Sequence, residues 1–66
     1  MKIILNGSEM EVNEKISLLD LMRMKNFDPS KYVAIVNEDV IPKSKIQDIT
    51  LNENDRVEII TMMGGG

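Results

Sequence analysis

The chain has 66 residues, a formal net charge of −3, no cysteine and no histidine. It is therefore at most one domain, with a marginal core, because a chain of this size buries only about 60% of its unfolded surface. The missing residue types exclude disulfides, thiolate metal sites, a cysteine nucleophile and the usual histidine base.

The charged and aromatic residues disfavour a nucleic-acid partner. The six lysines are scattered, and the chain has one Tyr, one Phe and no Trp, so it lacks both a basic patch and stacking platforms for bases. A mildly acidic surface instead suits a partner with a basic docking face.

No apolar run approaches the roughly 18 residues that a membrane-spanning helix needs. The opening segment, MKIILNGSEM, has a strand-like pattern and too short an apolar run for a secretory signal. We therefore expect a cytoplasmic protein without a membrane partner, and a monomer when it is free.

Residues 1–13 predict a β-hairpin with one buried face. Asn6-Gly7 is a strong hairpin signal, because both residue types tolerate positive φ. Alternation in the two flanking segments places Ile4 on the outward face. The inward positions of the predicted hairpin are Met1, Ile3, Leu5, Met10 and Val12.

The hydrophobic period changes from two to about 3.6 in ISLLDLMRMKN, which predicts a helix over about residues 17–26. Ser17 is the expected N-cap, and Asp20 follows at capping-box spacing. Asn26 can end the helix in the left-handed conformation. The expected inward stripe consists of Leu18, Leu21, Met22 and Lys25.

The segment from Tyr32 to Val36 is apolar at nearly every position, which predicts a strand with both faces at least partly covered. The pattern leaves open whether Val33 and Ile35 or Ala34 and Val36 face the helix.

The chain that follows this strand is irregular in pattern. It contains a short predicted edge strand at Val40 and Ile41, which Pro42 stops, and a turn with Asn54 as its left-handed residue. Three apolar residues are expected to pin this loop to the core, namely Ile46, Ile49 and Leu51.

The last predicted strand is RVEIITMM, residues 56–63, which alternates between two faces. Val57, Ile59 and Thr61 share one face, and Glu58, Ile60 and Met62 share the other. The order strand, strand, helix, strand, short strand, strand requires the helix to pack on one sheet face. We therefore expect an α+β fold of the ubiquitin-like β-grasp type. In that fold a mixed parallel and antiparallel sheet contains four or five strands. The last strand is central, and it lies beside and parallel to the first.

The whole chain, residues 1–66, resembles the ThiS family of small sulfur carriers in thiamine biosynthesis. The resemblance rests on the opening strand with its Asn-Gly turn, on AIVNEDVIPKSK, on ENDRVEII and on the terminal GGG. The chain departs from the family at two places. Asn54 occupies a position where the family usually has Gly. After Pro42 this chain has Lys-Ser-Lys-Ile, where the family commonly has a bulky residue. Asn tolerates the same backbone conformation as Gly, and we expect the second departure to lie in a loop. The small subunit of molybdopterin synthase, which shares the fold and the glycine ending but is typically longer, is the alternative.

The resemblance implies a protein carrier rather than an enzyme, formed by one domain over residues 1–66 with 63–66 as an exposed reactive tail. In the implied chemistry, an ATP-dependent activating enzyme adenylates the carboxylate of Gly66. A persulfide donor converts the adenylate to a thiocarboxylate, whose sulfur passes to a thiazole synthase. The implied partners are a ThiF-like adenylating enzyme, a ThiG-like thiazole synthase and a persulfide-bearing desulfurase or similar donor. The chain itself is expected to bind no cofactor and no metal, since ATP is used by the activating partner.

Two further groups of residues complete the predicted site. Gly64 and Gly65 lack Cβ atoms and so could thread a narrow channel in the partner enzymes; the alternative is a frayed tail without function. An outward apolar patch formed by Ile4, Ile60 and Met62 is the predicted docking surface. Its predicted polar rim is Asp55, Arg56 and Glu58.

Two other functions remain open from the sequence. The chain could be a ubiquitin-like interaction module without sulfur chemistry. It could also be a protein modifier whose Gly66 forms an amide with a lysine.

Overall fold

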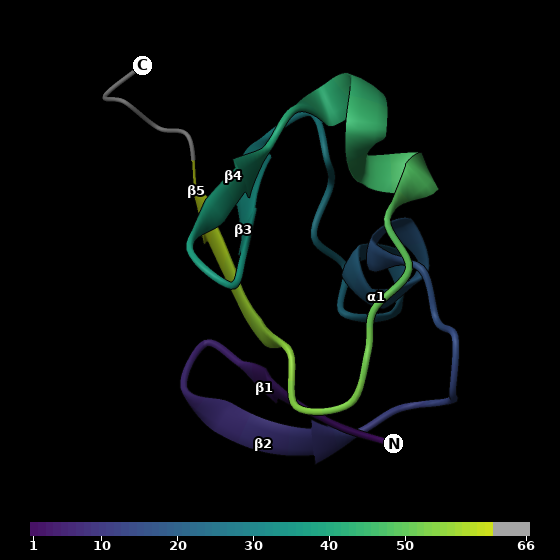
Figure 1. Cartoon of the computed structure of the whole chain (residues 1–66). Coiled ribbons are helices and arrows are strands. Elements are labelled where there is room, and N and C mark those ends of the chain that lie inside the picture. Colours follow the sequence, from purple (N-terminus) through teal and green to yellow (C-terminus); the bar gives the residue numbers. More distant parts are fainter. Residues whose placement is uncertain (62–66) are drawn as a thin grey trace.

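Within residues 1–61, a mixed five-stranded sheet carries one α-helix and one 3-10 helix on the same face (Figure 1). The computed structural model describes residues 1–61. The strand order across the sheet is β2-β1-β5-β3-β4, so the expected β-grasp is confirmed, with the last strand beside and parallel to the first. The elements are β1 (Lys2–Leu5), β2 (Ser8–Glu11), α1 (Leu18–Met24), β3 (Tyr32–Val36), β4 (Asp39–Ile41), the 3-10 helix η1 (Lys43–Asp48) and β5 (Arg56–Thr61).

The predicted N-terminal hairpin forms between β1 and β2, which pair antiparallel from Lys2 opposite Glu11 to Leu5 opposite Ser8. Asn6 and Gly7 have φ values of 50° and 84°, as a tight turn of type I′ requires. A Cβ at position 7 would meet no atom within 4 Å. The backbone conformation, rather than crowding, therefore favours glycine there.

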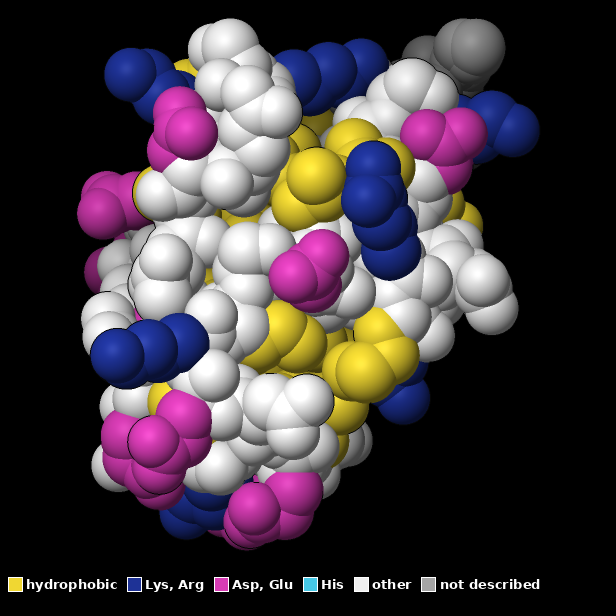
Figure 2. All heavy atoms as spheres, turned by 90° about the vertical axis from the view of Figure 1, so that its right-hand side faces the viewer, with side chains coloured by type: hydrophobic (Ala, Val, Ile, Leu, Met, Phe, Trp, Pro, Cys, Tyr) yellow, Lys and Arg dark blue, Asp and Glu magenta, His cyan; other side chains and the backbone are white. Residues whose placement is uncertain are grey.

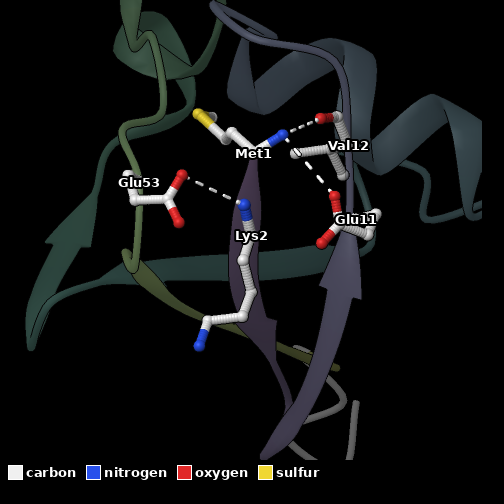
Figure 3. Close-up of polar contacts among 5 residues, drawn as sticks. All are labelled: Met1, Lys2, Glu11, Val12 and Glu53. Carbon is white, nitrogen blue, oxygen red and sulfur yellow. Dashed lines mark hydrogen bonds and ion pairs between the residues drawn. The ribbon is translucent and has the colours of Figure 1, made fainter.

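The start of β1 is held from two sides (Figure 3). The ammonium group of Met1 donates a hydrogen bond to the Val12 carbonyl at 2.8 Å and lies 3.7 Å from the Glu11 carboxylate. The backbone N–H of Lys2 donates to Glu53 Oε1 at 3.3 Å. These contacts join β1 to β2 on one side and to the turn before β5 on the other.

Helix α1 is capped at both ends by the residues that the sequence singled out. Ser17 Oγ accepts a hydrogen bond from the Asp20 N–H at 3.0 Å. At the other end Asn26 has φ 63°, and the Phe27 N–H donates to the Met22 carbonyl at 2.7 Å, which is a Schellman-type ending. The helix is therefore shorter than the predicted 17–26, because the end residues of that range act as caps.

The inward stripe of α1 is correct except at its last position. Leu18, Leu21 and Met22 have no exposed surface. Lys25 is exposed because it is the C-cap residue, where the helical repeat has already ended.

The open question about β3 is settled by its pairing with β5. Ala34 lies opposite Ile59 and Val36 opposite Val57. These four side chains are buried under the helices, whereas Val33 and Ile35 are only partly buried on the other face. The face of the sheet away from α1 is called the outer face below.

The segment predicted as an irregular loop contains the 3-10 helix η1, which begins directly after Pro42. The Lys-Ser-Lys-Ile departure from the family therefore lies in this helix and not in a loop. Ile46 and Leu51 anchor the segment in the core, with Ile49 packed against it. Asn54 has φ 68° and so confirms the predicted left-handed position.

The core lies between the sheet and the two helices and contains no charged or polar side chain among residues 1–61. No helix in this part of the chain is both long and apolar enough to cross a membrane. The buried residues are Ile3, Leu5, Val12, Leu18, Leu21, Met22, Ala34, Val36, Ile46, Leu51, Val57 and Ile59.

Candidate functional site

Strand β5 leads directly to the glycine ending of the chain and is the central strand of the sheet. It pairs with β1 only at its start, where Ile4 lies opposite Arg56 and Leu5 opposite Val57. On its other side β3 accompanies it along its whole length, to the pair of Tyr32 with Thr61. The final residues of β5 therefore extend beyond the end of β1.

Asn6 holds the part of β5 that β1 does not reach. Its backbone N–H donates to the Val57 carbonyl at 2.9 Å, and its side-chain Oδ1 accepts from the Ile59 N–H at 2.9 Å. One residue therefore forms the hairpin turn and extends the β1–β5 hydrogen bonding by one link. The sequence identified Asn6 only as a turn residue, because the second role depends on which strand lies beside it.

A turn at the start of β3 supports the opposite side of this region. The carboxylate of Asp28 accepts hydrogen bonds from the Ser30 N–H at 2.9 Å and the Ser30 hydroxyl at 2.8 Å. These bonds lower the pKa of the Asp28 carboxyl from its ordinary value of 3.8. Phe27 and Tyr32 flank the turn with ring centroids 5.0 Å apart in an edge-to-face arrangement, at the point where β3 meets the end of β5.

The predicted reactive tail lies outside the described residues. Gly64, Gly65, Gly66 and Met62 stay predictions, as does the tail boundary at residue 63. Among residues 1–61, no three acidic side chains gather in a way that could hold a metal ion.

The outer face carries a group of apolar side chains close to the end of β5. Ile60 is 50% exposed and Val40 is 65% exposed. In the register Val33 lies opposite Ile60 and Ile35 opposite Val40, so the four residues form one patch across β5, β3 and β4. This patch, Val33, Ile35, Val40 and Ile60, is called the outer cluster below.

Ile4 and Ile60 share the outer face, as the alternation indicated, but they are not neighbours. Ile4 lies opposite Arg56, four residues before Ile60 on β5, which corresponds to about 13 Å along a strand. Glu58 stands between them on the same face. The sequence missed three members of the outer cluster, because it could not tell which face of β3 points inward.

The predicted polar rim divides into two parts. Arg56 and Glu58 lie on the outer face, where they line an open hollow together with Ile35 and Glu38. Asp55 instead braces a turn. Its two carboxylate oxygens accept hydrogen bonds from the Asn37 side chain at 3.0 Å and from the Asn52 N–H at 2.8 Å.

Comparison with known proteins places these features in a family. A model of the ThiS family matches residues 3–66. The "uncharacterized protein ycf40" of Trieres chinensis is 34% identical over 62 residues, which cover 94% of this chain and 85% of that protein. A protein of Paramagnetospirillum magneticum named thiazole synthase is 29% identical over 66 residues. The match covers all of this chain but only 20% of the relative, so the chain spans one fifth of that protein's length.

Solved structures share the fold described above. The crystal structure of the thiamine biosynthesis protein ThiS from Geobacter metallireducens superposes with a TM-score of 0.86 at 25% identity, over the whole of both chains. A solution structure of a thiamine biosynthesis protein from the same organism gives a TM-score of 0.80 at 23% identity. This second likeness supports a shared fold and no more than that. With a β-grasp sheet and a family match that extends to Gly66, this chain belongs to the ThiS family.

Proposed function

We propose that this protein is a sulfur carrier for the synthesis of the thiamine thiazole, and that the α-carboxylate of Gly66 is its reactive group. The observation that carries the proposal is the family match through Gly66, on a fold whose central strand is described as far as Thr61, five residues before that glycine. The protein is a co-substrate of other enzymes and has no catalytic side chains of its own in this scheme.

The proposed chemistry begins at a group that is unreactive by itself. A C-terminal carboxyl has an ordinary pKa of about 3.3–3.7, so it is ionised at neutral pH and is a poor electrophile. Attack of this carboxylate on the α-phosphate of ATP releases pyrophosphate and leaves an acyl-adenylate. A persulfide then displaces AMP, and cleavage of the sulfur–sulfur bond by a second thiol of the donor leaves the thiocarboxylate. ATP and the donor bind to a ThiF-like adenylating enzyme and its sulfur-supplying partner.

Chain geometry limits where the partner can bind. Five residues extend at most about 16–18 Å beyond Thr61. The partner must therefore contact the folded domain within that distance of its own reaction centre. The outer cluster adjoins the end of β5, so it and Met62 meet this condition better than Ile4. Gly64 and Gly65 would enter the channel to the reaction centre, because a backbone without Cβ atoms can pass closely between channel walls.

The relative in Paramagnetospirillum magneticum supports a thiazole synthase as the acceptor of sulfur. A segment similar to this chain forms one fifth of a protein that is named thiazole synthase. A carrier and a synthase that act on each other gain from being joined, because linkage raises their effective concentration. A separate ThiG-like synthase would be the corresponding partner here.

Intact-mass spectrometry tests the proposal. The protein is incubated with ATP, a ThiF-like adenylating enzyme from the same genome and a persulfide donor. The expected result is a mass gain equal to the replacement of one oxygen by one sulfur, confined to the fragment that contains Gly66. The matched control is the chain without Gly66, which should gain nothing.

Two results would contradict the proposal. One is an unchanged mass under conditions in which the enzyme consumes ATP with this protein present. The other is an amide between Gly66 and a lysine of a second protein, which would identify a protein modifier instead. Transfer of the sulfur to molybdopterin precursors rather than to thiazole would assign the carrier to the alternative pathway.

A further inference from the structure

The charged side chains are divided unequally between the two sides of the sheet. Strand registers and the hollow beside β5 place four acidic and two basic residues on the outer face, a side-chain charge of −2. The outer-face residues are Glu9, Glu11, Glu38, Glu58, Lys2 and Arg56.

The opposite side of the molecule has the opposite sign. Helices α1 and η1 with their flanking loops, residues 13–31 and 42–50, carry four acidic and six basic residues, a side-chain charge of +2. Asp39 lies on the same side, because it pairs with the inward-facing Val36, and it lowers the side-chain charge of this side to +1. Figure 2, which views the molecule from this side, shows Lys and Arg side chains spread among the acidic ones. The whole chain is acidic, at −3, yet this side is not. The molecule is therefore electrically polarised across the sheet.

The acidic residues next to the outer cluster have no partners within the described part of the chain. Glu58 lies opposite Ile35 on β3 and two residues before Ile60 on the same face of β5. Glu38 lines the hollow beside Ile35. Neither carboxylate takes part in an ion pair or a side-chain hydrogen bond among residues 1–61.

The other two acidic residues of the outer face are already paired. The Glu9 carboxylate lies 3.6 Å from the Lys2 ammonium, and Glu11 lies 3.7 Å from the N-terminal ammonium. Among residues 1–61, the outer-face carboxylates without an ion pair are therefore Glu38 and Glu58. They lie beside the exposed apolar side chains and share their hollow with one cation, Arg56.

We propose that the outer cluster docks onto an apolar site bordered by Lys and Arg on the adenylating enzyme, with Glu38 and Glu58 as the residues that meet those cations. This inference rests on the proposed function. Docking at the outer cluster removes water from the two neighbouring carboxylates, and burial of an unpaired charge is costly. A partner that covers the cluster must therefore supply basic groups at its border.

The polarised charge also sets the orientation in which the carrier arrives. An enzyme that binds the polyanion ATP has cationic groups around its site. Its field attracts the outer face and repels the side formed by α1 and η1, so encounters with the outer face foremost are favoured. The end of β5 is then already next to the enzyme when contact begins.

Two double variants with the same net charge test the placement. Glu38→Lys with Glu58→Lys changes the outer face, and Glu14→Lys with Asp48→Lys changes the opposite side. All four residues are exposed, and each variant moves the formal charge from −3 to +1, because each of its two substitutions adds two charges. The measurement is the association rate constant with the ThiF-like adenylating enzyme by stopped flow, together with thermal melts followed by circular dichroism.

At low ionic strength the outer-face variant is expected to associate about tenfold or more slowly than wild type, since steering changes rates by about 10- to 1,000-fold. The Glu14/Asp48 variant should lose no more than about threefold, because its changed charges face away from the partner. At about 1 M salt, where the Debye length is about 3 Å, the difference between the two variants should largely disappear. The milder pair Glu38→Gln with Glu58→Gln guards against misfolding and should give an intermediate rate.

Equal slowing by the two lysine variants, or an unchanged rate for the outer-face variants that still melt like wild type, would overturn the inference. If wild type still forms the thiocarboxylate in that case, the proposed function stands and only the docking chemistry is wrong. If wild type gives no mass gain, the proposed function fails and this inference fails with it.

Discussion

Replacement of Asn6 by glycine should loosen the end of β5 while leaving the hairpin turn intact. Glycine readily adopts the φ of 50° found at position 6, so the type I′ turn should persist. What is lost is the hydrogen bond of 2.9 Å from the Ile59 N–H to Asn6 Oδ1. The Ile59 N–H lies beyond the end of β1, so no carbonyl group of β1 can accept its hydrogen bond in place of Asn6.

The expected size of the effect follows from the loss of this one bond. A typical intramolecular hydrogen bond contributes about 0.5–1.5 kcal/mol, and RT is about 0.6 kcal/mol, so local opening at Ile59 should become about 2- to 13-fold more frequent. Native-state amide hydrogen exchange measures this directly. Asn6→Asp is the matched control, because it tolerates the same backbone conformation and keeps an oxygen acceptor in place.

The comparison must separate local from global effects. The Phe27 amide, which closes the end of α1, serves as the remote reporter and should change only as much as global stability does. Unchanged exchange at Ile59 in the glycine variant would refute the role of Asn6. Equal acceleration at Ile59 and Phe27 would mean that Asn6 supports the whole domain rather than the end of β5.

Four further predictions concern the core, the docking surface, the tail and pH. Leu21→Ala empties a fully buried position and should reduce the free energy of unfolding by about 2–5 kcal/mol in urea denaturation; Leu19→Ala, half-buried on the same helix, should cost clearly less, and equal costs would mean the wrong helix face. Ile60→Glu should weaken binding to the adenylating enzyme with an unchanged circular dichroism spectrum, and unaffected binding would exclude the outer cluster as the docking site. One alanine appended after Gly66 moves the reactive carboxylate by about 3.3–3.6 Å and should abolish adenylation without altering the melting curve, whereas full adenylation would contradict the proposed chemistry. The lowered pKa of Asp28 means that its carboxylate stabilises the fold above about pH 3.8 and loses this contribution as the pH falls through its lower folded-state value; the denaturation midpoints of wild type and Asp28→Ala should therefore converge in acid, and a constant difference would contradict the assignment.

The features predicted correctly from the sequence are those that local chemistry determines. The Asn6-Gly7 turn, the Ser17 cap and the left-handed Asn26 each depend on a few neighbouring residues. The order of elements predicted a helix packed on one face of a sheet, and the central position of the last strand is what the β-grasp fold expected from that order implies. These signals were sufficient to define the fold.

The features that the sequence did not predict depend on contacts between distant segments. Glu38 has a φ of 76° in the turn between β3 and β4, although Glu is not a typical residue at positive φ. The 3-10 helix η1 buries only Ile46 among its six residues, too little for a periodic pattern. The inward face of β3 could not be chosen, because every residue from Tyr32 to Val36 is apolar. The outer cluster depends on that choice, so it too emerged only from the register.

The central position of β5 has a consequence for how the protein is made. The segment joins β1 to β3, but among the elements of residues 1–61 it is the last to be synthesised. Until it leaves the ribosome, the hairpins β1–β2 and β3–β4 have no strand between them and the core has no Val57 or Ile59. Pairing of position 4 with position 56 must also close nearly the whole chain into one loop, which slows folding. A chain truncated before β5 would therefore remain unfolded and be degraded by proteases. It would not compete with the complete protein for binding to the partner enzymes, because only chains that contain β5, and with it the attachment point of the glycine ending, can complete the sheet.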